Sequence, residues 1–113
     1  MRKISREAAA ALIAGTNYHN NNTRVCDGTM YLHGNAIAIK EPHGMCGVYA
    51  ITLAGWPTTT TKERVNTLLD MLGAPYRLCT VKGQVYAYNH KDGSKVALDP
   101  DAYYKVKPLE KLK

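Results

Sequence analysis

The most constraining feature of the sequence is the stretch of residues 51–73, ITLAGWPTTTTKERVNTLLDMLG. A short apolar run, which predicts the end of a strand, stops at Pro57. Proline cannot donate to a sheet ladder, and it disfavours a helical conformation at the residue before it. The apolar residues Val65, Leu68, Leu69 and Leu72 then recur with the spacing of one helix face, so a helix is predicted over about residues 61–72. Strand, break and helix therefore follow each other within this one stretch.

The predicted helix also carries start and stop signals. Four threonines stand where it must begin, and with Thr60 as the N-cap, Glu63 falls at the third helical position and completes a capping box. Gly73 supplies a left-handed stop. In this frame Arg64 lies in the first turn, where we expect it to be exposed, so that its replacement by alanine leaves the fold intact.

The rest of the chain predicts a short helix and a series of short strands. Ser5 is expected to cap a helix over residues 6–14 that Gly15 closes, and residues 16–22 are expected to form a loop. Strands are predicted from alternating polarity between turn residues. They cover residues 23–26, 29–33, 36–40, 45–53, 76–81, 84–88 and 95–98, with turns at Asp27-Gly28, Gly34-Asn35, residues 41–44 and Lys82-Gly83.

This pattern predicts an α+β fold, an antiparallel sheet of about five to seven short strands covered by the helices at 6–14 and 61–72. A chain of 113 residues can bury one core, so residues 1–113 are expected to be a single domain. From about residue 105 the chain is rich in lysine and ends without a capping signal. Residues 105–113 are therefore predicted to be a loose basic tail.

The distribution of charge, the cysteines and the apolar runs limit the classes of protein to which the chain can belong. The net charge is +6, but the basic excess lies mainly at the two ends, with Arg2, Lys3 and Arg6 at one and four lysines at the other. The three cysteines match neither a disulfide framework nor a zinc pattern, which favours a reducing cytosol. No apolar run is long enough to span a membrane.

Three motifs occur in a specific order: Asn22-Thr23-Arg24-Val25, the segment LHGNAIA at residues 32–38, and AGWPTTTTKERVN at residues 54–66. With them, residues 16–90 resemble a group of small bacteriophage accessory proteins. The resemblance implies phage origin and a shared scaffold, and it carries over no catalytic residues. The N-terminal helix and the lysine tail are expected to lie outside the shared pattern.

The start of the central helix is the leading candidate site. Helix N-termini favour anions, threonine hydroxyls and Arg64 would complete the site, and Trp56 would stack on a base. The structural alternatives stay open: the threonines only cap the helix, and Trp56 plugs the seam between helix and sheet. The candidate residues for an anion or a partner are Trp56, Thr58, Thr60, Thr61, Lys62 and Arg64.

A second candidate is a partner surface on the polar face of the sheet, because exposed tyrosines are typical of protein interfaces; an ordinary solvated face is the alternative. Its residues are Arg24, Tyr31, His33, Asn35, Tyr86 and Tyr88. His33 is expected to order a turn rather than to act as a catalytic base, and Asn35 to take a left-handed conformation there. His43 and Cys46 offer only two metal ligands, so no metal site is predicted.

Two functional hypotheses follow. The first is a non-enzymatic inhibitor in the cytoplasm of the infected bacterium, which binds a host or defence protein such as a CRISPR effector. The second is a module that binds nucleic acid or another phosphate-bearing ligand through the basic termini and the threonine-rich helix start. Neither hypothesis requires a cofactor, a metal or a membrane, and we expect none.

Overall fold

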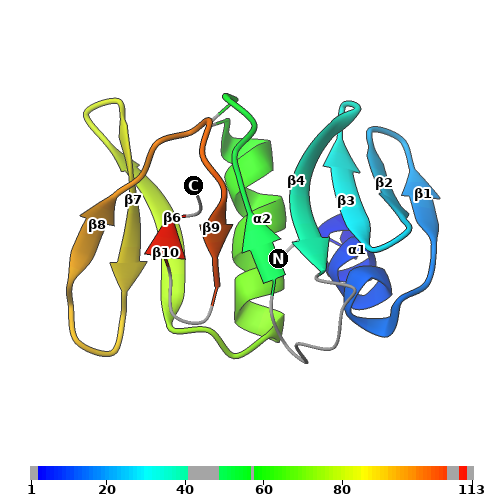
Figure 1. The fold of residues 1–113 in the computed structure, drawn as a ribbon, viewed down its shortest axis with the longest axis horizontal. Helices are drawn as coiled ribbons and strands as arrows, with labels where there is room; N and C mark the ends of the chain where they lie inside the picture. Colours follow the sequence, from blue (N-terminus) through cyan, green and yellow to red (C-terminus); the bar gives the residue numbers. More distant parts are fainter. Residues whose placement is uncertain (1–2, 41–48, 57, 107–109, 112–113) are drawn as a thin grey trace.

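The computed structural model describes residues 3–40, 49–56, 58–106 and 110–111, which form two helices and ten strands (Figure 1). The α+β class is confirmed, but the strands form two antiparallel sheets and not one. The larger sheet contains, in spatial order, β1 (Tyr18–Asn20), β2 (Thr23–Cys26), β3 (Thr29–Leu32), β4 (Asn35–Lys40), β5 (Tyr49–Ile51), β9 (Tyr104–Lys105) and β10 (Glu110–Lys111). The smaller contains β6 (Tyr76–Val81), β7 (Gln84–Asn89) and β8 (Lys95–Ala97).

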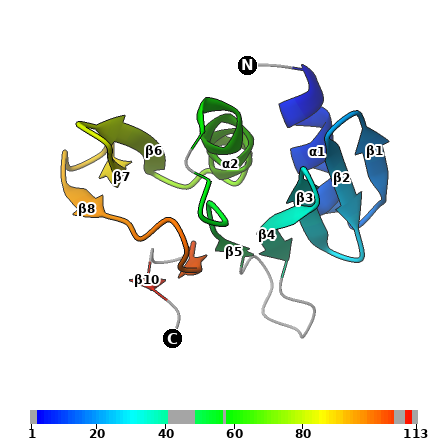
Figure 2. The same cartoon turned by 90° about the horizontal axis from the view of Figure 1, so that it is seen from above.

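Both helices lie on one side of the larger sheet, with α2 (Thr59–Met71) between α1 (Lys3–Ala14) and the smaller sheet (Figure 2). The central helix therefore packs against neighbours on three sides. Asn66 fixes it to β6, because its side-chain amide accepts from the Leu78 amide at 2.6 Å and donates to the Leu78 carbonyl at 3.0 Å. This amide takes the place of a strand partner along β6.

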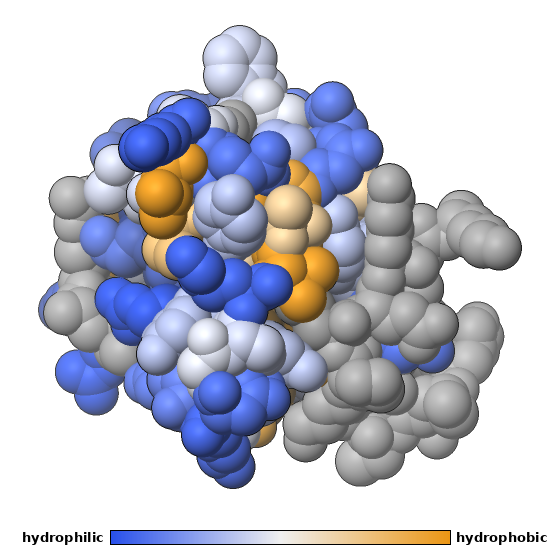
Figure 3. All heavy atoms as spheres, turned by 90° about the vertical axis from the view of Figure 1, so that its left-hand side faces the viewer, coloured by the Kyte–Doolittle hydropathy of each residue, from blue (hydrophilic) through white to orange (hydrophobic). Residues whose placement is uncertain are grey.

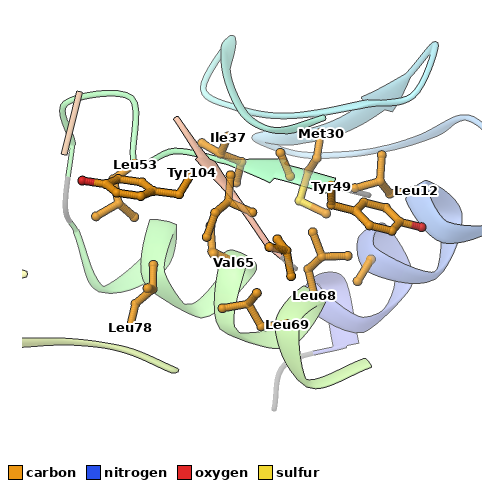
Figure 4. Packing of buried hydrophobic residues seen from close by; sticks show 14 of the residues in the cluster. Leu12, Met30, Ile37, Tyr49, Leu53, Val65, Leu68, Leu69, Leu78 and Tyr104 are labelled. Carbon is orange, nitrogen blue, oxygen red and sulfur yellow. The ribbon is translucent and has the colours of Figure 1, made fainter. Parts of the chain in front are cut away.

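The core fills the space between α2, α1 and the larger sheet (Figure 4). Leu68 and Val65 of α2 are fully buried and share the cluster with Met30 and Ile37 of the sheet and Leu12 of α1. Burying each such side chain stabilises the fold by about 1.5–3 kcal/mol. The helical periodicity of the sequence therefore identified the correct face of α2.

The helix ends agree with the sequence at their C-termini. Ala74 donates to Leu69 and Gly73 donates to Asp70, which is the Schellman arrangement, with Gly73 at φ +73°. Gly15 closes α1 in the same manner, at φ +79°.

The predicted starts of both helices are wrong. The N-cap of α2 is Thr58 and not Thr60, and α1 begins at Lys3, before Ser5. Ser5 is fully buried inside α1, where its hydroxyl bonds to Glu63. The capping box fails because, with Thr58 as the N-cap, the third helical position is Thr61, and the Glu63 carboxylate instead accepts from Ser5 of α1.

Two of the three predicted tight turns that the structure describes are confirmed, at Asp27-Gly28 and Lys82-Gly83, where both central residues have positive φ. The third is shifted by one residue. His33 and Gly34 carry the positive φ values, and Asn35 is already the first residue of β4, paired with Leu32. The predicted loop at residues 16–22 contains strand β1.

The basic tail is not loose where the structure describes it. β9 pairs with β5 in the larger sheet, and β10 pairs with β9 at its edge. Tyr104 and Val106 are buried in the core cluster. The prediction of a loose tail was wrong because lysines alternate with the apolar residues that are buried in the core.

Several predictions fall outside the described residues. These are the turn at residues 41–44, the first part of the strand predicted from residue 45, and any role of His43, Cys46 or Pro57. Among the described helices, none combines the length and the apolar character needed to cross a membrane.

Candidate binding site

A groove of about 400 Å³ lies where the β3–β4 turn meets the start of α2. It joins two regions that the sequence singled out separately, the turn at His33 and the threonine-rich helix start. Its described lining residues are Leu32, His33, Asn35, Ile37, Leu53, Ala54, Trp56, Thr58, Thr60 and Thr61. Of the predicted anion-site residues, Trp56, Thr58, Thr60 and Thr61 line it, whereas Lys62 and Arg64 do not.

The floor of the groove is apolar and its rim is aromatic and polar. Leu32, Ile37 and Leu53 form the floor and also belong to the hydrophobic core, as Figure 4 shows for Ile37 and Leu53. Trp56 stands on the rim with 63% of its surface exposed. The interpretation that Trp56 plugs the seam between helix and sheet is therefore wrong. An exposed tryptophan beside an apolar floor is an arrangement suited to contact with another molecule, as at protein interfaces.

A strained turn holds Trp56 in place. Ala54 and Gly55 have φ values of +52° and +76°, and the Trp56 amide donates to the Leu53 carbonyl at 2.8 Å. The Gly55 amide donates to the Pro100 carbonyl at 2.9 Å. Glycine suits the positive φ of this position, and a Cβ added there would lie 2.5 Å from Oδ1 of Asp101, so that this side chain would have to move.

The first turn of α2 forms the opposite wall. The Thr61 amide donates to Oγ1 of Thr58 at 3.2 Å, and the two hydroxyls are 2.9 Å apart. The cap therefore uses the Thr58 hydroxyl, and the wall of the groove is lined by hydroxyls. The partial positive charge of the helix N-terminus favours a ligand group that carries negative charge or a carbonyl dipole.

The groove is otherwise neutral. Among its described lining residues His33 carries the one ionisable side chain. The ammonium group of Lys62 is turned toward β6 and bonds to the Thr80 hydroxyl.

The expectation that Arg64 is exposed and completes an anion site is wrong, since it is 2% exposed. The residue lies on the α1-facing side of α2, one turn before Leu68. Its Nη1 donates to Ser5 Oγ at 2.6 Å and to Glu63 Oε1 at 3.3 Å, and its Nε donates to Thr23 Oγ1 at 3.1 Å. Arg64 therefore joins α1, α2 and β2 inside the protein.

Hydrogen bonds connect this buried arginine to the groove. The Thr23 hydroxyl donates to Oδ1 of Asn22 at 2.9 Å, and Nδ2 of Asn22 lies 3.4 Å from Nε2 of His33. The His33 amide donates to the Asn22 carbonyl at 2.9 Å. The polar residues of the Asn22-Thr23 motif thus hold the turn that carries His33.

The predicted partner surface is divided by the fold. Arg24 and Tyr31 are paired across β2 and β3, with the guanidinium carbon 4.7 Å from the ring centre. His33 and Asn35 lie at the groove, and Tyr86 and Tyr88 lie on β7 of the smaller sheet. The six residues therefore do not form one surface.

No three His, Cys, Asp or Glu side chains group as a possible metal site within the described ranges. Sequence reasoning missed the groove floor, because Leu32, Ile37 and Leu53 carry only the signal of core residues. The contact between the β3–β4 turn and the turn that carries Trp56 joins segments distant in the sequence, so it has no local sequence signal.

Comparison with known proteins gives one family. Residues 1–105 match the model described as Kyanoviridae Gp96 protein. The match includes α1 and reaches β9, so the N-terminal helix lies inside the shared pattern, contrary to expectation. No curated protein and no solved structure matches the chain.

Proposed function

Because the chain belongs to the Kyanoviridae Gp96 protein family, a family of phage proteins, we propose that it acts in the infected host by binding a host protein in the groove beside Trp56. The observation that carries this proposal is the exposed tryptophan on the rim of an apolar, uncharged groove. The action is non-enzymatic, and its consequence is inhibition of a host or defence component.

The composition of the groove favours a protein segment as its occupant. An apolar or aromatic side chain would displace water from Leu32, Ile37 and Leu53, and Trp56 would close over it. Tryptophan is among the residues that contribute most to the binding energy of protein interfaces. The threonine hydroxyls and Asn35 would bond to the backbone of the same segment.

A nucleotide is less favoured at this site. Phosphate sites normally add cations to a helix N-terminus. Here the guanidinium of Arg64 is buried between the helices, and the Lys62 ammonium is held by Thr80. The described parts of the basic chain ends do not supply the charge together either, because the first turn of α1 and strand β10 lie on opposite sides of the molecule in Figure 2.

The experiment is site-specific photo-crosslinking in infected cells. A photoreactive phenylalanine analogue replaces Trp56 in one variant and Met71 in the control. Met71 is 42% exposed and ends the same helix, at the opposite end from Thr58. A host protein crosslinked at position 56 and not at position 71 is the expected result. Absence of any host protein at position 56, or the same proteins at both, would overturn the proposal.

Phage yield tests the inhibitory consequence separately. Phage carrying Trp56→Ala should multiply less well than the parent only in hosts that contain the crosslinked protein. Equal yields in hosts with and without that protein would show that binding does not inhibit it.

A further inference from the structure

The smaller sheet presents an outer face that the groove does not use. Val85 and Ala87 of β7 are buried against the core, so the alternating residues Tyr86 and Tyr88 point away from it. Figure 3 views the molecule from this side, where hydrophilic side chains surround smaller apolar patches. From the strand register, the residues of this face are Arg77, Cys79, Val81, Gln84, Tyr86, Tyr88, Lys95 and Ala97.

The charge of this face has one sign. Tyr88 is paired with Arg77 on one side and with Lys95 on the other, and the ammonium of Lys95 lies 5.4 Å from the ring centre of Tyr86. None of the three strands contains an aspartate or a glutamate. Lys82 adds a further cation at the β6–β7 turn. The loop beyond β7 is neutral in sum, because it carries Lys91 and Asp92.

We infer that this face binds single-stranded nucleic acid. Two residues along a strand span about 6.8 Å, so Tyr86 and Tyr88 form two successive platforms on which unpaired bases can stack. Tyrosines on the middle of an antiparallel sheet stack bases in this manner, and flanking cations pair with the phosphates. A duplex hides the faces of its bases, so it would gain only the charge contacts.

The charge of this face favours a nucleic acid over a protein as its ligand. A sheet face that carries Arg77 and Lys95, with Lys82 at the adjoining turn and no strand carboxylate, is complementary to a polyanion. The groove beside Trp56 is uncharged and has a different occupant, so the two sites are independent.

Fluorescence anisotropy with labelled oligonucleotides of about 12 nucleotides tests the inference, since single-strand sites span about 4–16 nucleotides. The probes are oligo-dT, oligo-U and a duplex of equal length. The intact chain should bind both single strands more tightly than the duplex. Tyr88→Ala should weaken single-strand binding about tenfold, and Tyr88→Phe should retain it.

Two further variants distinguish stacking from charge. Arg77→Gln should reduce the slope of log K against log salt by about 0.7, the value for one phosphate contact on a single strand. Tyr31→Ala is the matched control, because Tyr31 lies under Arg24 on the other sheet. It should leave single-strand binding unchanged.

The inference is overturned if the intact chain binds no single strand at low salt, or if Tyr31→Ala weakens binding as much as Tyr88→Ala. It is also overturned if a crosslinker at position 88 captures a protein after nuclease treatment while no oligonucleotide binds. Each result leaves the groove proposal standing, because Trp56 is not part of this face.

Discussion

Nη1 of Arg64 donates a hydrogen bond of 2.6 Å to Oγ of Ser5, across the interface between the two helices. Ser5 in turn donates to Oε1 of Glu63 at 2.9 Å, so arginine, serine and glutamate form a closed group. Charged groups are seldom buried unless they are paired and hydrogen-bonded, and here both conditions hold. Arg64 therefore has a structural role and does not bind an anion at the helix start.

Replacement of this arginine should destabilise the fold. Arg64→Ala removes the guanidinium that donates to Ser5, Thr23 and Glu63, and losing hydrogen bonds to a charged group costs about 1.5–3 kcal/mol. Arg24→Ala is the control, because Arg24 is exposed and its contact with Tyr31 is worth about 0.5–1 kcal/mol. Denaturant unfolding measures both. Equal losses in the two variants would show that the buried network does not stabilise the protein.

The two turn glycines should differ in their tolerance of alanine. Gly34→Ala introduces only a left-handed alanine, which costs about 1–2 kcal/mol, because the added Cβ meets nothing within 4 Å. Gly55→Ala has the same conformational cost, and its Cβ also forces the exposed Asp101 carboxylate out of its present position. Thermal unfolding should therefore give a lower Tm for Gly55→Ala. A lower Tm for Gly34→Ala would contradict this account of the Trp56 turn.

The chain end should contribute to stability. Val106 is 1% exposed, and truncation to alanine removes two methyl groups worth about 0.8 kcal/mol each. Lys105 is the neighbouring control, and its replacement by alanine should change stability by less than about 0.5 kcal/mol. If Val106→Ala unfolds at the same denaturant concentration as the parent, residues 104–106 do not belong to the core.

The carboxyl of Asp92 should titrate below its ordinary range. Hydrogen bonds from the side chain and the backbone amide of Ser94 stabilise its charged form and lower its pKa. Because the folded pKa is depressed, this group favours the folded state above its unfolded pKa, and the effect is lost as the pH falls through the folded pKa. NMR titration of Ser94→Ala should show the pKa moving upward, and an unchanged value would exclude the hydroxyl as the cause.

The sequence predicted the local features of the fold and missed those that depend on distant contacts. Helix periodicity identified Val65 and Leu68 as core, and the turn pairs at Gly28 and Gly83 placed two hairpins correctly. These signals depend on neighbouring residues only, so they can be interpreted without knowledge of the tertiary structure. The N-cap was misplaced because four consecutive threonines offer equivalent caps, and packing of Glu63 against Ser5 selects among them.

The candidate site was predicted only in part, again because sequence signals are short-range. Trp56 and the threonines were identified by their unusual composition. The role of Arg64 was wrong, because helix position alone does not tell which side another helix will cover. The second sheet was missed because nothing local separates β6 and β7 from the strands of the first.

The central claim is that the groove beside Trp56 binds a host protein, and retention from infected-cell lysate tests it most directly. The immobilised parent, Trp56→Ala and Met71→Ala are compared, with the Tm of each measured beside it. All three should melt at similar temperatures, because the replaced side chains are exposed, Trp56 at 63% and Met71 at 42%. At least one host protein should be retained by the parent and by Met71→Ala and lost by Trp56→Ala, as a central interface tryptophan is worth about 2 kcal/mol or more. Retention of the same proteins by all three would contradict the claim.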